Sequence, residues 1–178
     1  MTTAVQKTRV QRRFELLDVD NNGKIDAQDF KAEAQRIVKA FKESEETPRG
    51  KAVIDAYLSQ WSYLAQKAGI PEAGSLSPQQ FADVGEEHMF GLGESGFSKV
   101  LRPAIQAIVN LVDSDGDGRI SPSEFKVWLD AMGVDSSQAQ DAFEQIDMDG
   151  DGQLSLEEMV EAVRRFVYGE SDVPLLGR

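Results

Sequence analysis

The stretch DSDGDGRISPSEF at residues 113–125 places acidic side chains at regular intervals within a short loop. Ca²⁺ takes six to eight oxygen ligands, and a twelve-residue loop can supply them from positions 1, 3, 5, 7, 9 and 12. In this stretch those ligands would be Asp113, Asp115, Asp117, the carbonyl of Arg119, Ser121 through water, and Glu124. The stretch therefore predicts a calcium-binding loop between two helices.

Two further stretches repeat this pattern. DMDGDGQLSLEEM at 147–159 begins 34 residues after the first, and DVDNNGKIDAQDF occupies 18–30. The predicted ligands are Asp147, Asp149, Asp151, the Gln153 carbonyl, Ser155 and Glu158 in one loop, and Asp18, Asp20, Asn22, the Lys24 carbonyl, Asp26 and Asp29 in the other. The sequence thus predicts three Ca²⁺ sites. Asp29 is one methylene shorter than glutamate, so we expect Mg²⁺, which is smaller and octahedral, to compete most in that loop.

Other positions of the loops have structural roles. Position 6 requires a positive φ angle, which glycine adopts without steric cost, and Gly23, Gly118 and Gly152 occupy it. Position 8 is apolar (Ile25, Ile120 and Leu154), so two loops can pair through it by a short β-bridge. SPSE at 121–124 and SLEE at 155–158 are capping boxes that start the helix after each loop.

A fourth repeat is present without its ligands. GIPEAGSLSPQQF at 69–81 keeps the frame, with Gly74 at position 6, Leu76 at position 8 and a capping box, SPQQ, at 77–80. The ligand positions hold Gly69, Pro71, Ala73 and Gln80, none of which is a carboxylate. We expect this unit to fold like the others and to bind no metal.

Helical periodicity surrounds each loop, which predicts an all-α protein. Val10, Phe14 and Leu17 precede the first loop at helical spacing, and Val53, Tyr57, Trp61 and Leu64 mark a helix before the second. Paired loops suggest two halves packed into a compact globule: residues 1–92, with one active and one degenerate unit, and residues 93–178, with two active units. The joints are Pro48-Arg49-Gly50 and the glycine-rich segment 91–96, and Pro103 is expected to kink a helix or to mark its start.

Composition narrows the classes of function. The 178 residues carry a net charge of −12, which disfavours binding to nucleic acid or anionic membranes. The absence of cysteine excludes disulfides, thiolate zinc sites and cysteine nucleophiles. The first residues lack an apolar stretch of signal-peptide length, and no apolar run could span a bilayer. We therefore expect a soluble cytoplasmic protein, a monomer without an obligatory protein target.

Some features have simpler alternatives. A single acidic loop could be a solvated turn or a non-helical calcium loop, but two complete loops with flanking helices argue against this. Segment 91–96 matches GxGxxG, yet no strand precedes it, so a hinge is favoured over a dinucleotide site. His88, the only histidine, is expected to be a surface or partly buried residue. The basic cluster of Lys7, Arg9, Arg12 and Arg13 is expected to be the solvent face of the first helix.

With these loops, joints and the degenerate second unit, the chain resembles the calerythrin-like and sarcoplasmic calcium-binding proteins, which have four EF-hands. The resemblance covers essentially the whole chain, and the opening MTTA, Asp29 and the ending DVPLLG resemble the actinobacterial branch. It implies two packed pairs of EF-hands and a calcium-buffering role.

Two functions compete: an intracellular calcium buffer or transporter, and a sensor that regulates a partner through an apolar groove exposed by calcium. An enzyme is not expected, because the EF-hands occupy nearly the whole chain. Sensor grooves are often rich in methionine, and this chain has five methionines. The tail carries Val173, Leu175 and Leu176, which we expect to dock onto the protein itself and to occupy the place of a target.

Overall fold

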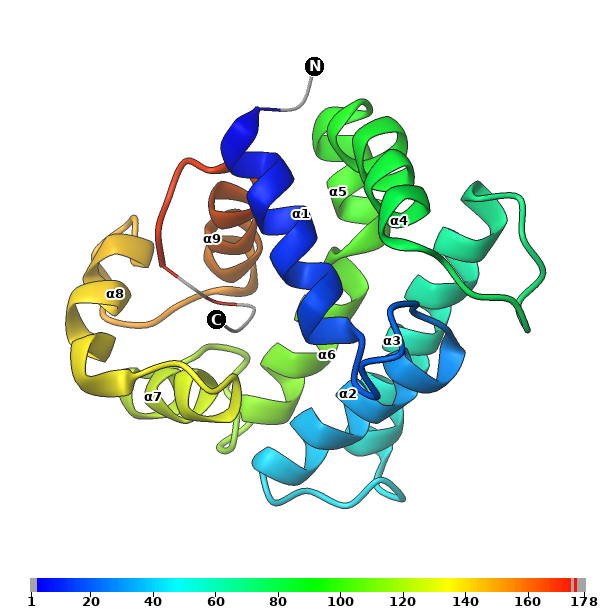
Figure 1. The fold of residues 1–178 in the computed structure, drawn as a ribbon. Coiled ribbons are helices and arrows are strands. Elements are labelled where there is room, and N and C mark those ends of the chain that lie inside the picture. The colour runs from blue at the N-terminus through cyan, green and yellow to red at the C-terminus, as the bar shows by residue number, and fades with distance from the viewer. Residues whose placement is uncertain (1–2, 174, 176–178) are drawn as a thin grey trace.

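The computed structural model describes residues 3–173 and 175, and these form an all-α protein. Figure 1 shows α1 lying across the front of the other helices. The α-helices are α1 (Ala4–Leu17), α2 (Ala27–Ala40), α3 (Pro48–Lys67), α4 (Pro78–Val84), α5 (Gly93–Val100), α6 (Arg102–Val112), α7 (Pro122–Ala131), α8 (Ala139–Ile146) and α9 (Leu156–Tyr168). A π-helical segment, η1 (Gly85–Phe90), follows α4, and a 3₁₀ turn, η2 (Ser136–Gln138), precedes α8.

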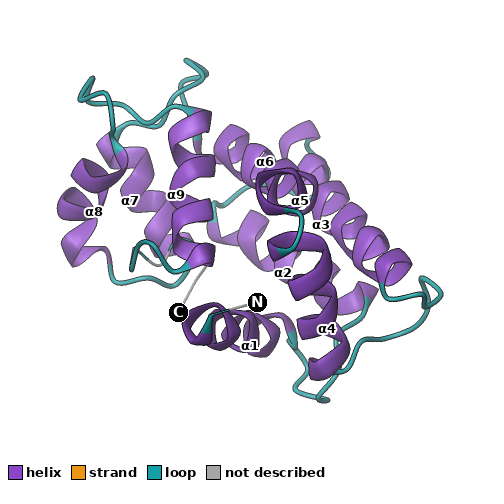
Figure 2. Cartoon of the chain, turned by 90° about the horizontal axis from the view of Figure 1, so that it is seen from above, coloured by secondary structure: helices purple, strands orange, loops and turns teal. Residues whose placement is uncertain are grey.

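The loops pair in twos through single antiparallel bridges, as their apolar eighth positions predict. Ile25 and Leu76 exchange backbone hydrogen bonds of 3.0 and 2.8 Å, and Ile120 and Leu154 exchange two of 2.8 Å. All four side chains are fully buried. The loops between α1 and α2 and between α3 and α4 therefore form one pair, and the two loops of the α6–α9 region form another at the opposite side of the molecule (Figure 2).

One hydrophobic core joins the helices of both pairs. Trp61, Trp128, Phe30, Phe97 and Phe125 are among its largest fully buried side chains. Helix α3 packs against α6, and α1 packs against both α4 and α9. The loops are thus held at the rim of a shared core.

Two arginines from α2 and α3 bind the C-terminal ends of helices in the second half. The Arg49 guanidinium donates to the carbonyl of Asp113, at the end of α6, over 2.9 Å. The Arg36 guanidinium donates to the carbonyl of Ala131, the last residue of α7, over 3.1 Å. A cation at a helix C-terminus also interacts favourably with the helix dipole. These contacts tie α2 and α3 to the two helices that flank the loop at 113–124.

The predicted joints are more compact than the sequence suggests. Segment 91–96 is a tight turn, because Gly93 already begins α5 and Gly96 lies inside it. A Cβ atom on Gly91 would lie 2.6 Å from the Glu87 carbonyl oxygen, so glycine permits the close approach of η1 to this turn. Pro48 and Gly50 belong to the first turn of α3. Pro103 lies in the first turn of α6 and marks the start of that helix, one of the two outcomes expected.

The basic cluster of α1 is only partly a solvent face. Lys7 and Arg12 are exposed, but the side chains of Arg9 and Arg13 are only 17% and 16% exposed. Arg9 binds the C-terminal tail, and Arg13 lies 3.9 Å from a carboxylate oxygen of the buried Glu33. The prediction of a wholly solvated basic face was therefore wrong for these two arginines, since each has a tertiary partner that the spacing within one helix cannot reveal.

Candidate metal centres

The loop at 113–124 brings three of its four predicted carboxylates together, and Asp117 is not in this group. Ligand oxygens of Asp113, Asp115 and Glu124 all lie within 4.8 Å of one another. Two oxygens bound to one Ca²⁺ at about 2.4 Å cannot be more than about 4.8 Å apart. The arrangement is therefore compatible with one shared calcium ion.

Backbone N–H groups hold the first carboxylate of this loop in place. Asp113 accepts from the N–H of Gly116 at 2.7 Å and from that of Gly118 at 2.9 Å. Both glycines have left-handed φ angles, 76° and 79°. The repeat pattern predicts this conformation at position 6, but it was not predicted at position 4. Glycine at position 4 of two loops was the signal that could have shown it.

The loop at 147–158 repeats this geometry. Asp147, Asp149 and Glu158 form the corresponding group of carboxylates within 4.8 Å. Asp147 accepts from the N–H groups of Gly150 and Gly152 at 2.8 and 3.0 Å. The two loops of this pair thus present the same donor set in the same conformation.

The loop at 18–29 reaches a similar arrangement with different residues. Asp18, Asp20 and Asp29 place ligand oxygens within 4.8 Å of one another. Asn21 occupies position 4 with a φ angle of 56°, a conformation that asparagine adopts more readily than most residues. Asn22, at position 5, accepts from the N–H of Lys24 at 2.8 Å, as the position-5 aspartates do in the other loops.

The residues at position 12 bridge positions 2 and 9 of each loop. Glu124 accepts from the backbone N–H of Ser114 at 2.8 Å and from that of Ser121 at 2.9 Å. Asp29 makes the equivalent pair of bonds, with Val19 at 3.1 Å and Asp26 at 2.9 Å. The shorter side chain therefore still reaches both partners, and it is 95% buried in doing so.

The two kinds of position-12 carboxylate differ in pKa. Burial raises the pKa of Glu124, but bonds from the backbone and hydroxyl groups of Ser121 and Ser114 outweigh it and lower the pKa to about 2. Burial also raises the pKa of Asp29, and here the two backbone bonds do not offset it. The loop at 18–29 has Val19 and Asp26 in place of those serines, so it lacks the hydroxyl donors and adds a neighbouring negative charge. Asp29 therefore loses its proton less easily than Glu124 does.

Side chains at position 7 connect the two loops of the second pair. The Arg119 guanidinium donates to Asp151 at 2.5 Å, and the Gln153 amide donates to Asp117 at 3.4 Å. Each position-7 side chain thus contacts the position-5 carboxylate of the other loop. The ligands predicted at position 7 are the backbone carbonyls of Arg119 and Gln153. The side-chain contacts were not predicted, because they depend on how the two loops pair.

The loop at 69–80 keeps the bridge and loses the metal-binding geometry. Its one carboxylate, Glu72, accepts a hydrogen bond from the hydroxyl of Ser62 in α3. The Glu72 carbonyl accepts from the indole N–H of Trp61 at 2.9 Å. Gly74 is not among the residues with a positive φ angle, although its place in the repeat predicts one. The loop is therefore a structural partner of the loop at 18–29.

Comparison with known sequence families gives two matches. A profile of the EF-hand domain pair matches residues 102–164, and a profile of the EF hand matches residues 10–32. These matches cover the three loops that carry clustered carboxylates.

Individual proteins match along the whole chain. Calerythrin from Saccharopolyspora erythraea is 40% identical over 177 residues, covering 99% of this chain and all of that protein. A Streptomyces coelicolor calcium-binding protein, described in connection with prokaryotic calcium-mediated regulation, has a TM-score of 0.71 and 27% identity, covering 92% of this chain and 98% of its own. A sarcoplasmic calcium-binding protein from amphioxus, 17% identical, has the same fold, with a TM-score of 0.75 and coverage of 100% and 99%. The chain belongs to the calerythrin-like family of EF-hand calcium-binding proteins and has three candidate calcium sites.

Proposed function

We propose that this protein is a calcium buffer or transporter of the cytoplasm that binds three Ca²⁺ ions per chain. The ions would bind at loops 18–29, 113–124 and 147–158, through the carboxylates, carbonyls and position-9 side chains predicted from the sequence. The chain would act as a monomer made of two EF-hand pairs, residues 1–92 and 93–178. Mg²⁺ would compete for the same loops, most effectively at the loop that ends in Asp29.

The observation that carries the buffer role is the docked C-terminal tail. Leu175 is fully buried and Val173 is 8% exposed. The indole N–H of Trp128, in α7, donates to the carbonyl of Leu175 over 3.1 Å. Leu176, which was also predicted to dock, lies outside the described residues. Because this apolar surface is already covered by the chain itself, it is not available to a target helix.

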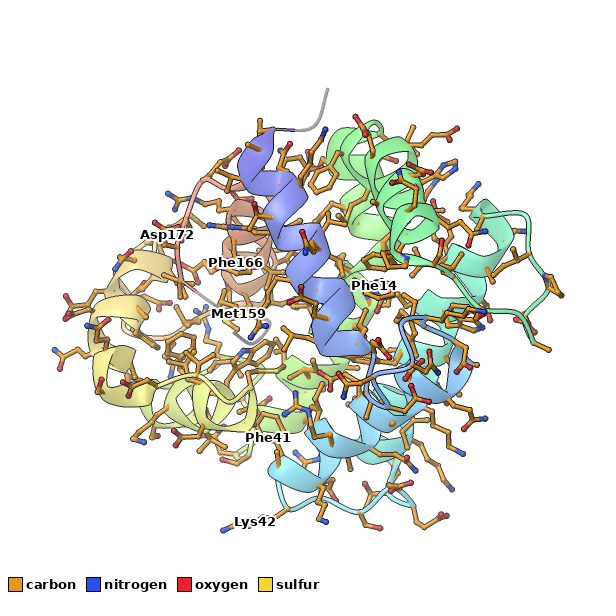
Figure 3. All side chains as sticks on the ribbon, in the orientation of Figure 1. Phe14, Phe41, Lys42, Met159, Phe166 and Asp172 are labelled. Carbon is orange, nitrogen blue, oxygen red and sulfur yellow. The ribbon has the colours of Figure 1, made fainter. Side chains whose placement is uncertain are left out.

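Arg9, in α1, binds the beginning of the tail. The Arg9 guanidinium donates to the carbonyl of Ser171 at 2.8 Å and to the carboxylate of Asp172 at 2.9 Å. The same guanidinium lies 4.2 Å from the ring centre of Phe166, in α9. Figure 3 shows Phe166 on α9 beside α1 and Asp172 on the tail that follows this helix. The tail thus has contacts at Ser171 and Asp172 and again at Leu175, which supports a self-occluded protein.

A calcium sensor is the alternative function. It is favoured by the likeness to the Streptomyces coelicolor protein associated with calcium-mediated regulation. In a sensor, calcium would release or reshape an apolar surface, so the intact calcium-loaded protein would expose it. The two proposals therefore differ in what the calcium-loaded wild-type protein exposes.

Fluorescence of 8-anilinonaphthalene-1-sulfonate on calcium-loaded protein distinguishes the two functions. Leu175→Asp would place a charge in a fully buried position and should release the tail. We expect low dye binding by the wild type, strong binding by Leu175→Asp and by a chain that lacks residues 171–178, and little change in the control Val127→Asp, which adds the same charge at an exposed position of α7. Strong binding by the wild type, with no increase on tail release, would contradict the buffer role and support the sensor.

A further inference from the structure

The loop at 18–29 contains the pair Asn22-Gly23 at its positions 5 and 6. The chain has three asparagines, and Asn22 is the one that precedes a glycine. Asparagine is a thermolabile residue, because the backbone nitrogen of the next residue can attack its side-chain amide. A glycine in that next place hinders the attack least, since it has no side chain and the most mobile backbone. The pair is therefore a reactive element at a predicted ligand position.

Water and space are available around this pair. Asn22 and Gly23 are both exposed. Apart from the chain neighbours of Gly23, no atom lies within 4 Å of the place that a Cβ atom on this glycine would occupy. A ring that formed between the two residues would therefore meet no obstacle, and water could reach it.

The folded loop restrains all of the reacting groups. The side-chain carbonyl of Asn22 accepts from the N–H of Lys24 at 2.8 Å, and its NH₂ group donates to Asp20 at 2.9 Å. The N–H of Gly23 donates to Asp18 at 2.9 Å. Asp18 and Asp20 belong to the group of carboxylates within 4.8 Å of one another, so their repulsion favours opening of the loop when no cation lies between them.

We propose that Asn22 is a site of spontaneous deamidation and that bound calcium protects it. The Gly23 nitrogen forms a bond to the side-chain carbonyl carbon of Asn22 and gives up its proton. The amide nitrogen takes up a proton and leaves as ammonia, which yields a cyclic imide. Water then opens the ring at either carbonyl, to aspartate or to isoaspartate, without any oxidant or reductant. The protection by calcium rests on the proposed ion site at 18–29.

The two products have opposite effects on the loop. Aspartate gives position 5 the carboxylate that Asp117 and Asp151 provide in the other loops, and a higher charge count of the ligands strengthens calcium binding. Isoaspartate carries the chain through the former side chain, which adds one carbon to the backbone between positions 5 and 6. Asp29, at position 12, then loses its register with Asp18 at position 1. The aspartate form should keep the ion of this loop, and the isoaspartate form should lose it.

Incubation of the full chain at physiological temperature, with excess calcium or with a chelator, tests the proposal. Mass spectrometry of proteolytic peptides measures deamidation at each asparagine. We expect the reaction at Asn22 to be at least about tenfold slower with calcium, equivalent to about 1.4 kcal/mol of added protection against opening. Asn110, in α6 before the buried Leu111, is the internal control and should stay intact in both conditions. Asn22→Gln should stay intact at this position, because the larger ring forms more slowly.

Separation of the products completes the test. The peptide from Asn22→Asp identifies the aspartate product, and the other product of the same mass is isoaspartate. Calorimetry should give three Ca²⁺ ions per chain for the aspartate form and two for the isoaspartate form.

Three results would overturn the proposal: an Asn22 that stays intact in chelator, an isoaspartate form that binds three ions, or equal rates in the two conditions while the unmodified protein binds three ions. Equal rates with an unmodified protein that binds two ions would instead refute the proposed site at 18–29 and, with it, the protection by calcium.

Discussion

Position 12 is where the three acidic loops differ most at the scale of single residues. Asp29 and Glu124 bridge the same two backbone N–H groups, but their pKa values are shifted in opposite directions. Although Asp29 is one methylene shorter than Glu124, it still reaches both N–H groups. Bidentate capture of a calcium ion is a stricter requirement, because both oxygens must reach one point.

Replacing Asp29 with glutamate should raise the preference of the loop at 18–29 for Ca²⁺ over Mg²⁺. The longer side chain can offer two oxygens to the larger ion, whereas a single-oxygen contact suits octahedral Mg²⁺. We expect a change of about tenfold, equivalent to about 1.4 kcal/mol. Competition calorimetry with both ions measures it, and Glu124→Asp is the matched control, which should lower the preference of its own loop. An unchanged preference in Asp29→Glu would refute this account of position 12.

Glu33 is a buried carboxylate that no motif in the sequence singles out. Its side chain is 5% exposed, and it accepts hydrogen bonds from Arg36 at 2.8 and 2.9 Å. Burial opposes its ionisation, but the bonds from Arg36 and the charges of Arg13 and Arg36 outweigh it and lower the pKa of Glu33. The pair of Glu33 with Arg36 can be predicted from their spacing of three residues on one helix. The contact with Arg13 depends on the packing of α1 against α2.

The substitution Glu33→Gln should destabilise the protein in a pH-dependent way. A carboxylate whose pKa is lowered on folding stabilises the protein above its unfolded pKa, and this contribution is lost as the pH falls through the folded pKa. We expect the variant to lose about 3 kcal/mol of unfolding free energy at pH 7. The difference from the wild type should shrink at acid pH. Urea unfolding at several pH values measures it, and a difference that grows on acidification would be the wrong sign.

At the scale of elements, the loop at 69–80 explains why a unit without ligands is still folded. Leu76 is fully buried and forms the bridge to Ile25 in the active loop. The apolar residue at position 8 of the repeat predicted this bridge. It did not predict the conformation of Gly74, because without a metal the loop is held by contacts of Glu72 with α3.

A change in this loop should therefore weaken metal binding in its partner. Leu76→Ala removes a buried side chain and should cost about 2–4 kcal/mol of stability. We expect calcium affinity to fall at the loop at 18–29 and to remain unchanged at the other two loops. Ala73→Ser, at an exposed position of the same loop, is the control. NMR titration resolves the three sites, and an equal loss of affinity at all of them would argue against local coupling through the bridge.

The glycine-rich segment 91–96 shows what sequence patterns cannot give at this scale. Its composition indicates a hinge, and the structure has a tight turn between η1 and α5. A Cβ atom on Gly96 would lie 2.7 Å from the Met89 carbonyl oxygen, so this glycine serves a close backbone approach. Glycine allows both outcomes, and only the tertiary packing of the two helices decides between them.

For the whole molecule, the balance of charge predicts that stability depends on bound metal. The three acidic loops contain 13 acidic residues, and the chain has a net charge of −12. Three divalent cations would add six positive charges and reduce the mutual repulsion of these groups.

The loop spacing predicted the carboxylate clusters because each cluster lies within twelve consecutive residues. The contact of Arg49 with the Asp113 carbonyl could not be predicted, since it joins helices that are distant in the chain.

Removal of calcium should accordingly lower thermal stability and compactness. We expect the melting temperature to drop by more than 10 °C when a chelator is added, since a ligand that binds only the folded state stabilises it by mass action (about 4 kcal/mol for one site at a thousandfold excess over Kd). Differential scanning calorimetry with and without chelator provides the measurement. A melting curve that the chelator leaves unchanged would contradict the account.

The number of ions per chain tests the central claim most directly. Calorimetric titration of the metal-free protein with Ca²⁺ should give three ions per chain. Asp18→Ala, Asp113→Ala and Asp147→Ala should each remove one ion, because each substitution removes the first carboxylate of one loop. Binding of a fourth ion within residues 69–80, or a stoichiometry of two that Asp18→Ala leaves unchanged, would contradict the account.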